Sequence, residues 1–196
     1  MRLSGKGDSR ETLERTLDIL EKELISIVGE YVYGRDDDTL EKITGRLLRE
    51  LNETVVTAES CTGGYIAHLI TTVPGSSDYY LGSVIAYANE VKVNELGVRP
   101  RTIEKYGAVS RETVTEMAMG IRNKFGAGYA IAVSGIAGPG GGTPEKPVGT
   151  IWLALAGPEE VQTEQLHLTF GRIENITRTS YSAINMLRRT LLKRKG

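Results

Sequence analysis

The chain has 196 residues with 24 basic and 25 acidic side chains, which leaves a formal net charge of −1. Without a clustered excess of Lys and Arg it lacks the basic face that binds phosphates, so we expect no nucleic-acid partner. No run of about 18 to 20 apolar residues is present and the first ten residues are polar, so we expect no membrane partner and no signal peptide. The single cysteine excludes an intrachain disulfide, which fits the cytoplasm, where we expect this protein.

The N-terminal segment predicts a helix with one apolar seam. Apolar side chains recur there at alternating spacings of four and three residues: Leu13, Leu17, Leu20, Leu24, Ile27 and Tyr31. This spacing is typical of a coiled coil, although the same face could pack within the chain. We expect it to form a homodimer or higher homo-oligomer. A charged turn at residues 34–38 follows, which divides a helical extension over 1–38 from a domain over 39–196.

Beyond residue 38 the apolar pattern predicts alternating helices and strands. Asp38 and Glu41 form a capping-box pattern that starts a helix, and Ser110 and Gly126 bound another. The predicted helices span 38–51, 62–72, 110–125 and from 174, and the predicted strands span 54–58, 82–88, 129–134, 148–156 and 166–170. Because the connections at 134–148 and 157–161 contain no crossover helix, we expect a mixed sheet. The predicted fold is α/β, a three-layer α/β/α arrangement preceded by the helical extension.

Residues 58–64, Ala-Glu-Ser-Cys-Thr-Gly-Gly, lie where the first strand turns into a helix. Such a turn directs backbone N–H groups into a crevice that suits an oxyanion. The expected donors are the N–H groups of Cys61, Thr62, Gly63 and Gly64. Ser60 and Cys61 are both candidate nucleophiles, and a plain capped turn would carry the same residue types.

Two further segments are unusual for a scaffold. Tyr87 and Lys92 follow the second strand, where a lysine can return an amine toward a neighbouring loop. Residues 134–149 are rich in glycine, which lets the backbone approach a ligand closely, but the Gly-Lys-Ser/Thr sequence of a P-loop is absent. His68 and His167 have no neighbouring ligand at metal spacing, so no metal is expected.

Taken together, these motifs resemble the CinA C-terminal domain family. The resemblance covers about residues 40–170 and rests on residues 58–64, 74–77, 87–92, 107–110 and 134–149 in unbroken order. It implies a nicotinamide-nucleotide amidase, which hydrolyses the carboxamide of nicotinamide mononucleotide to nicotinate mononucleotide and ammonia without a metal or cofactor. It also implies that Ser60 is the nucleophile and Lys92 its partner.

Amide hydrolysis needs an activated nucleophile, an oxyanion site and a proton for the leaving ammonia. Lys92 can act as a base if burial lowers the pKa of its amine, and Tyr87 could relay the proton. Cys61 ranks below Ser60 because a cysteine nucleophile normally requires a histidine. The expected substrate contacts to the pyridine mononucleotide are Glu59, Ser76, Ser77, Asn89, Ser134, Gly135, Ala137, Gly138, Gly140 and Gly141.

Two positions depart from the family pattern. Ala88 stands where serine is common, and Gly171-Arg172-Ile173 replaces Gly-Asp-Arg. The alternatives are therefore a non-catalytic nucleotide-binding or regulatory module, and an amidohydrolase that acts on another small amide.

Overall fold

The computed structural model describes residues 4–195, except for the side chain of Glu30. Two compact units make up the chain, Met1–Thr39 and Leu40–Gly196. Within the described residues, none of the helices is both long enough and apolar enough to cross a bilayer.

The N-terminal unit is built on α1, Arg10–Val28, followed by a short 3₁₀ turn, Gly29–Tyr31. The Ser9 hydroxyl caps α1 by accepting the N–H of Thr12. No residue of α1 is buried, and on the apolar seam Ile27 is 74% exposed. The helix is therefore amphipathic but has no hydrophobic core beneath its apolar face.

The second unit contains one five-stranded sheet in the order β2-β1-β3-β4-β5. The strands are β1 Val55–Glu59, β2 Tyr80–Ile85, β3 Tyr129–Gly135, β4 Thr150–Ala156 and β5 Val161–His167. The first three are parallel, with Glu59 paired to both Ile85 and Val133, whereas β4 and β5 are antiparallel to their neighbours. The sheet is thus mixed, as predicted.

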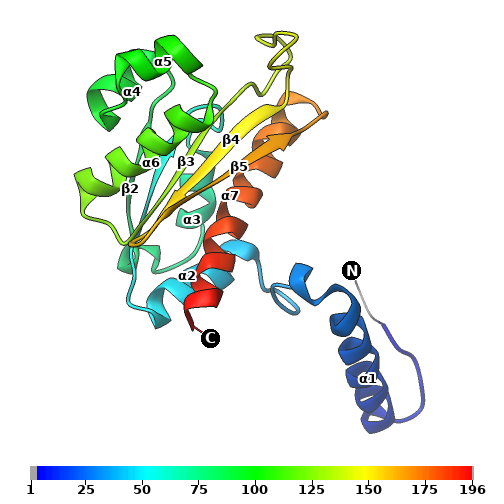
Figure 1. Ribbon diagram of the computed structural model, residues 1–196. Helices are drawn as coiled ribbons and strands as arrows, with labels where there is room; N and C mark the ends of the chain where they lie inside the picture. Colours follow the sequence, from blue (N-terminus) through cyan, green and yellow to red (C-terminus); the bar gives the residue numbers. More distant parts are fainter. Residues whose placement is uncertain (1–3, 196) are drawn as a thin grey trace. The chain divides into compact units, whose positions relative to one another are not determined.

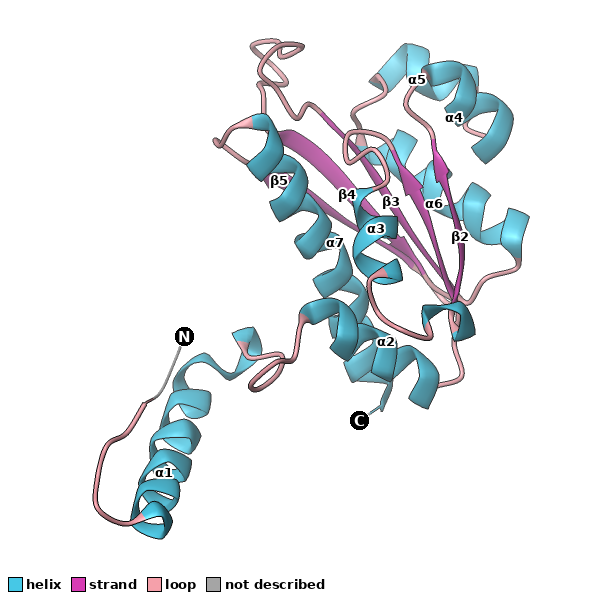
Figure 2. Cartoon of the chain, turned by 180° about the vertical axis from the view of Figure 1, so that it is seen from behind, coloured by secondary structure: helices cyan, strands magenta, loops and turns pink. Residues whose placement is uncertain are grey.

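Helices cover both faces of the sheet (Figure 1). One face carries α3 (Tyr65–Thr71) and α7 (Arg172–Lys195), which lie in front of the sheet in Figure 2. On this side α2 (Leu40–Glu50) packs against α7 and α3. The other face is covered by α6 (Arg111–Phe125), against which α4 (Asn89–Leu96) and α5 (Pro100–Tyr106) pack. A 3₁₀ turn, Ser76–Asp78, precedes β2. The predicted three-layer fold is confirmed.

Two hydrophobic clusters fill the spaces between the layers, because successive strand residues point to opposite faces. On the α7 side, Val55, Ile131 and Val133 pack with Ile184 and Leu187. The α6 side joins small strand residues to larger helix residues: Val56, Ala58, Ala130 and Ala132 meet Val114, Met117 and Ile121. Small residues on this face let α6 lie close to the sheet.

The bounds of two predicted elements need correction, and two helices were missed. The fifth strand spans 161–167 instead of 166–170, the last helix begins at Arg172 instead of Glu174, and two short helices, α4 and α5, were not predicted. Ser110 and Gly126 do cap α6 as predicted: the Ser110 hydroxyl accepts the N–H of Thr113, and Gly126 has a left-handed conformation.

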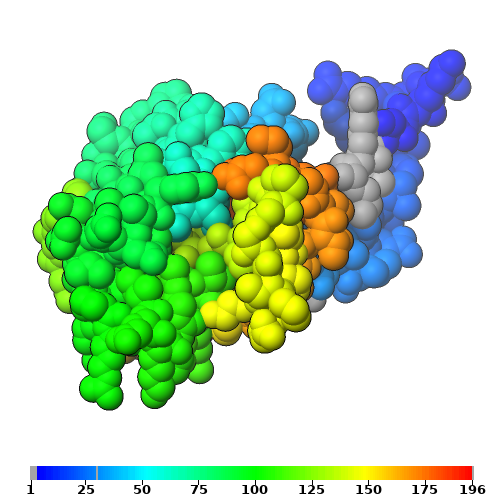
Figure 3. All heavy atoms as spheres, turned by 90° about the horizontal axis from the view of Figure 1, so that it is seen from above, coloured from blue at the N-terminus to red at the C-terminus, as the bar shows by residue number. Residues whose placement is uncertain are grey.

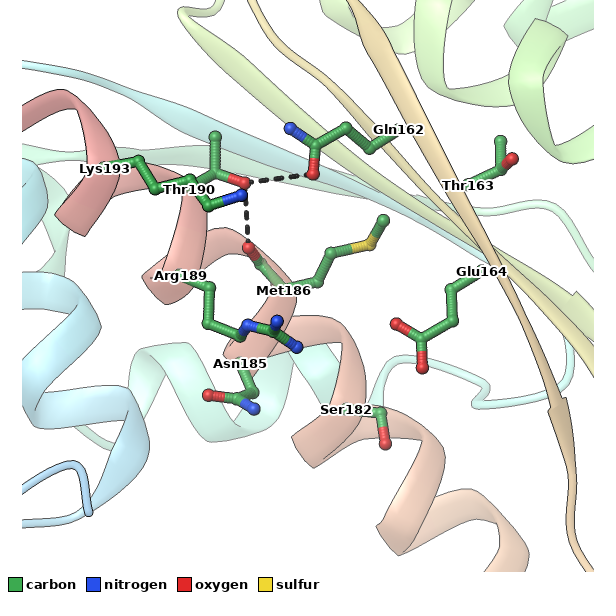
Figure 4. A pocket seen from close by; sticks show the side chains of 9 residues that line it. All are labelled: Gln162, Thr163, Glu164, Ser182, Asn185, Met186, Arg189, Thr190 and Lys193. Atoms are coloured by element: carbon green, nitrogen blue, oxygen red, sulfur yellow. Dashed lines mark hydrogen bonds between the residues drawn. The ribbon is translucent and has the colours of Figure 1, made fainter. Parts of the chain in front are cut away.

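A groove of about 300 Å³ runs between the edge strand β5 and α7. Figure 4 shows its polar lining, in which Glu164 on the strand and Arg189 on the helix lie on opposite walls. None of the site residues predicted from the sequence lines this groove.

Candidate active site

The predicted motifs meet at one edge of the sheet. Because β1, β2 and β3 are parallel, their carboxyl ends, Glu59, Ile85 and Gly135, lie side by side. The loop over 136–149 leaves the same edge, since β4 starts there beside Gly135. Seen from above in Figure 3, the molecule is hollowed between the green segment near residue 100 and the yellow loop near residue 145. Ligands of open α/β sheets bind at such an edge.

Ser60 occupies the first position after β1. Its N–H donates to Val133 O at 3.1 Å, which continues the parallel pairing by one residue. Gly63 and Gly64 then adopt positive φ angles of 61° and 99°, which few other residues tolerate, and α3 begins at Tyr65. This sharp strand-to-helix turn presents the Ser60 hydroxyl at the edge of the sheet.

The Lys92 amine reaches this hydroxyl from α4. Nζ lies 3.1 Å from Ser60 Oγ, 2.7 Å from Ala86 O and 3.2 Å from Tyr87 O, and the residue is only 1% exposed. Among the described residues no carboxylate forms an ion pair with it. A neutral amine has two N–H donors and one lone pair. The ammonium form donates to all three oxygens, and the neutral form can donate to the two carbonyls and accept the Ser60 proton with its lone pair. The same geometry therefore accommodates both protonation states of a base.

Burial shifts the pKa values of Lys92 and Cys61, two ionisable residues next to Ser60. Desolvation lowers the pKa of Lys92 below its ordinary value, although the nearby Cys61 opposes the shift. Desolvation raises the pKa of the Cys61 thiol to about 12. At neutral pH the thiol is therefore protonated and a poor nucleophile, which supports the ranking of Ser60 above Cys61.

Two of the four predicted oxyanion donors are occupied. The N–H of Gly63 donates to Ser60 O at 3.1 Å, and that of Gly64 donates to a Glu59 carboxylate oxygen at 3.0 Å. Within residues 4–195, neither the N–H of Cys61 nor that of Thr62 donates to the backbone of another residue. The candidate oxyanion donors are therefore the N–H groups of Cys61 and Thr62.

Glu59 is not placed as a substrate ligand. Its side chain is fully buried beneath α3, where it accepts hydrogen bonds from the turn and the helix instead of facing the edge. The structure therefore gives this carboxylate contacts within the chain, in place of the predicted contact with substrate.

Ser76 and Ser77 lie at the opposite edge of the sheet. After β1 the chain returns through α3, so residues 76–78 precede β2, and the N–H of Val55 at the start of β1 donates to Tyr79 O. The length of β1, about 3.3 Å per residue, separates them from Ser60. The topology therefore does not bring these two predicted contacts together with Ser60.

Tyr87 presents its carbonyl to Lys92 and its hydroxyl to Arg172. The phenol oxygen accepts Nη2 of Arg172 at 3.1 Å, while Nη1 donates to Gly138 O at 2.8 Å. The Tyr87 ring is 62% exposed at the rim of the site. Its hydroxyl contacts neither Ser60 nor Lys92, so the proposed proton relay has no geometric basis.

Arg172 is the functional candidate that the sequence motifs missed. It begins α7, where a cation is disfavoured by the helix dipole, and this unfavourable position is a signal that could have identified it. Its guanidinium contacts two uncharged acceptors, Tyr87 Oη and Gly138 O. Its charge is therefore free to attract an anion at the edge.

Side chains outside the glycine-rich loop and within it hold the loop against neighbouring segments. Asn175 donates to Ala137 O at 3.1 Å, and Lys146 extends to Tyr106 O and Val109 O. Ser134 donates to Ala108 O at 2.7 Å, so its hydroxyl proton is already used. A Cβ at Gly135 would lie 2.5 Å from Ile151, which shows that this glycine serves strand pairing.

The remaining predicted contacts stay at the edge. Asn89 starts α4 and is exposed, and its cap residue, Ala88, supplies no side-chain hydrogen bond. Gly140 and Gly141 are exposed in the loop, and Gly138 carries the carbonyl that Arg172 binds. These positions, unlike Ser76 and Ser77, follow the carboxyl ends of β2 and β3, at the same edge of the sheet as Ser60.

The fold and the site define a three-layer α/β protein with a buried serine–lysine pair at the carboxyl edge of its parallel strands. The chain belongs to the CinA C-terminal domain family, whose model matches residues 37–191. It is 50% identical over 191 residues to a CinA-like protein of Cytophaga hutchinsonii, covering 97% of this chain and 46% of that protein. A CinA-like protein of Desulfosudis oleivorans is 55% identical over 166 residues, 84% of this chain and 40% of that protein. The chain thus spans less than half of the length of these relatives.

Solved structures share the fold. The competence/damage inducible protein of Agrobacterium tumefaciens superposes with a TM-score of 0.73 at 38% identity, covering 79% of this chain and 96% of that one. The competence or damage-inducible protein of Enterobacter asburiae gives a TM-score of 0.75 at 32% identity, covering 79% and 99%.

Proposed function

We propose that this protein is a serine amidohydrolase that converts nicotinamide mononucleotide to nicotinate mononucleotide and ammonia. The observation that carries the proposal is the 3.1 Å contact between Lys92 Nζ and Ser60 Oγ in a site where the amine is buried without a carboxylate partner. A site that only binds a nucleotide has no use for a desolvated base beside a hydroxyl.

The reaction is assigned to named atoms. Ser60 Oγ attacks the carboxamide carbon while its proton passes to the Lys92 amine, and the N–H groups of Cys61 and Thr62 receive the oxyanion. Collapse breaks the C–N bond, and the Lys92 ammonium gives its proton to the departing NH₂ group, which leaves as ammonia. Water then attacks the resulting ester by the same base, releasing the carboxylate and free Ser60.

Charge at the site favours an anionic substrate. Arg172 lies beside the exposed Tyr87 ring with only uncharged acceptors, so a phosphate can bind it without displacing an ion pair. The exposed ring offers an apolar surface to a pyridine. These two features support a mononucleotide over an uncharged small amide.

The decisive assay measures ammonia release by the purified protein in the presence of a chelator. Nicotinamide mononucleotide is compared with nicotinamide riboside and nicotinamide, and we expect release from the mononucleotide at least about tenfold faster, because only it offers a phosphate to Arg172. Equal rates on all three would indicate an amidase for another small amide. Binding of the mononucleotide without ammonia release would favour a non-catalytic nucleotide-binding module.

We further propose that α1 mediates self-association. Leu20 and Ile27 are exposed on the seam of α1 at coiled-coil spacing, and Tyr31 is exposed in the 3₁₀ turn that follows. Burying these side chains against a second copy would remove apolar surface from water. Deleting residues 1–33 is expected to convert a dimer or higher oligomer into a monomer by light scattering.

A point variant makes this test sharper. Leu20→Glu introduces a charge into the seam and should also yield monomers, whereas Ser26→Glu adds the same charge outside it and should not. Dividing the measured mass by the mass of one chain gives the number of copies in the particle. If the deletion variant has as many copies as the full chain, α1 is not the contact.

A further inference from the structure

Glu59 carries an unusual set of contacts for a residue next to a nucleophile. Oε2 accepts the Thr62 hydroxyl at 2.7 Å and the N–H groups of Gly64 and Ile66 at 3.0 and 3.1 Å. Oε1 accepts the N–H of Ala67 at 2.8 Å and the Thr57 hydroxyl at 3.3 Å. The side chain is 0% exposed, and all five partners donate to it. These bonds tie together the strand before Ser60 and the turn and helix after it.

This carboxylate replaces the missing cap of α3. The residue at the cap position is Gly64, which has no side chain, so the first N–H groups of the helix would otherwise be unsatisfied in a buried place. Glu59 satisfies them from within β1, one residue before the nucleophile. Buried N–H groups without acceptors would destabilise the turn, so the carboxylate fixes the position of the helix relative to the strand.

The same contacts decide where an oxyanion can bind. Because Glu59 occupies the N–H groups of Gly64, Ile66 and Ala67, the start of α3 offers no free donor to a substrate. The unoccupied turn donors are those of Cys61 and Thr62, on the same stretch of chain as Ser60. A small shift of the turn would move the nucleophile and both donors together.

We propose that Glu59 is the positioning residue of the catalytic turn: it fixes Ser60 and the N–H groups of Cys61 and Thr62 in the geometry that acyl transfer requires. The inference rests on the proposed serine chemistry but does not depend on which amide is the substrate. A displacement of about 1 Å at a reacting group costs about 10²-fold in rate, and loss of an oxyanion donor costs a similar factor.

The test measures the rate at which a fluorophosphonate, a serine-directed probe, labels the purified full chain, read by intact mass. Glu59→Ala removes all five contacts and should slow labelling about 10²-fold. Glu59→Gln keeps one carbonyl oxygen for Thr62, Gly64 and Ile66 but turns an NH₂ toward Ala67, so labelling should slow only about tenfold. With nicotinamide mononucleotide, kcat should fall by similar factors while KM changes less than about threefold, because the substrate does not touch Glu59.

A matched control separates positioning from stability. Leu48→Ala creates a cavity in the core on α2 and lowers the melting temperature without touching the edge, so its labelling rate should stay within about twofold of the wild type. Labelling of Glu59→Gln at the wild-type rate would overturn the assignment. So would a labelling rate that falls as far in Leu48→Ala as in Glu59→Gln, or a wild type that is not labelled at Ser60. Labelling that depends on Glu59 in a protein inert toward the mononucleotide would retain the assignment and reject the proposed substrate.

Discussion

Replacing Ser60 by alanine is expected to abolish ammonia release, lowering kcat on the order of 10⁴-fold or more. No other described hydroxyl contacts the Lys92 amine, so the variant loses the atom that forms the covalent intermediate. In serine hydrolases, removal of the nucleophile leaves only the residual catalysis of the oxyanion site and of substrate binding. The measurement is ammonia release from nicotinamide mononucleotide, with folding monitored by circular dichroism.

Cys61→Ala is the matched control for this variant. The thiol is adjacent to Ser60 in the chain and buried, and desolvation raises its pKa to about 12, so almost no thiolate exists at neutral pH. Its removal deletes one sulfur atom and should leave activity within about threefold of the wild type. If Cys61→Ala abolished activity while Ser60→Ala retained it, the nucleophile would be the thiol.

The parts of the site that depend on local chain geometry were predictable from the sequence. Ser60 sits on a strand-to-helix turn because a β-branched strand is followed by small polar residues and paired glycines, a local signal. Lys92 follows the next parallel strand, and parallel strands end at one edge, so its approach to Ser60 follows from topology. The pairing of these two residues was predicted from the family resemblance, and the direction of the strands gives its physical reason.

The direction of side chains was not predictable in the same way. Glu59 alternates to the face beneath α3, whereas the sequence motif alone suggested a polar group aimed at substrate. Ser76 and Ser77 were associated with a phosphate by residue type, but the return through α3 carries them to the far edge. Arg172 was treated as a departure from a family pattern, and only the fold shows that it contacts Tyr87.

The errors in the elements have a common physical cause, which is weak amphipathic patterning. β5 is an edge strand whose residues are mostly polar, so its alternation is faint and the more apolar residues 166–170 gave the stronger signal. α4 and α5 are eight and seven residues long, too short to display a helical period clearly. Both helices pack on α6, a tertiary contact that a short sequence window does not reveal.

Replacing Lys92 by methionine is expected to lower kcat by about 10³-fold while leaving the fold intact. General bases contribute about 10² to 10⁴-fold, and methionine fills a similar volume in a site that is almost fully buried. Lys92→Arg should be equally inactive, because a guanidinium stays protonated and has no lone pair for the Ser60 proton. Lys124→Met, which removes an exposed lysine paired with Glu95, should retain full activity.

The wild-type pH profile provides the second readout of Lys92. The neutral amine is the active form, so kcat/KM should rise about tenfold per pH unit and level off as Lys92 loses its proton. Because burial lowers the pKa of this amine, the midpoint should fall below the value of about 10.4 that an exposed lysine shows. Lys124→Met should show the same rise of kcat/KM with pH, whereas the residual activity of Lys92→Met should not show it. A midpoint at the ordinary lysine value, or the same rise in Lys92→Met, would show that another group supplies the base.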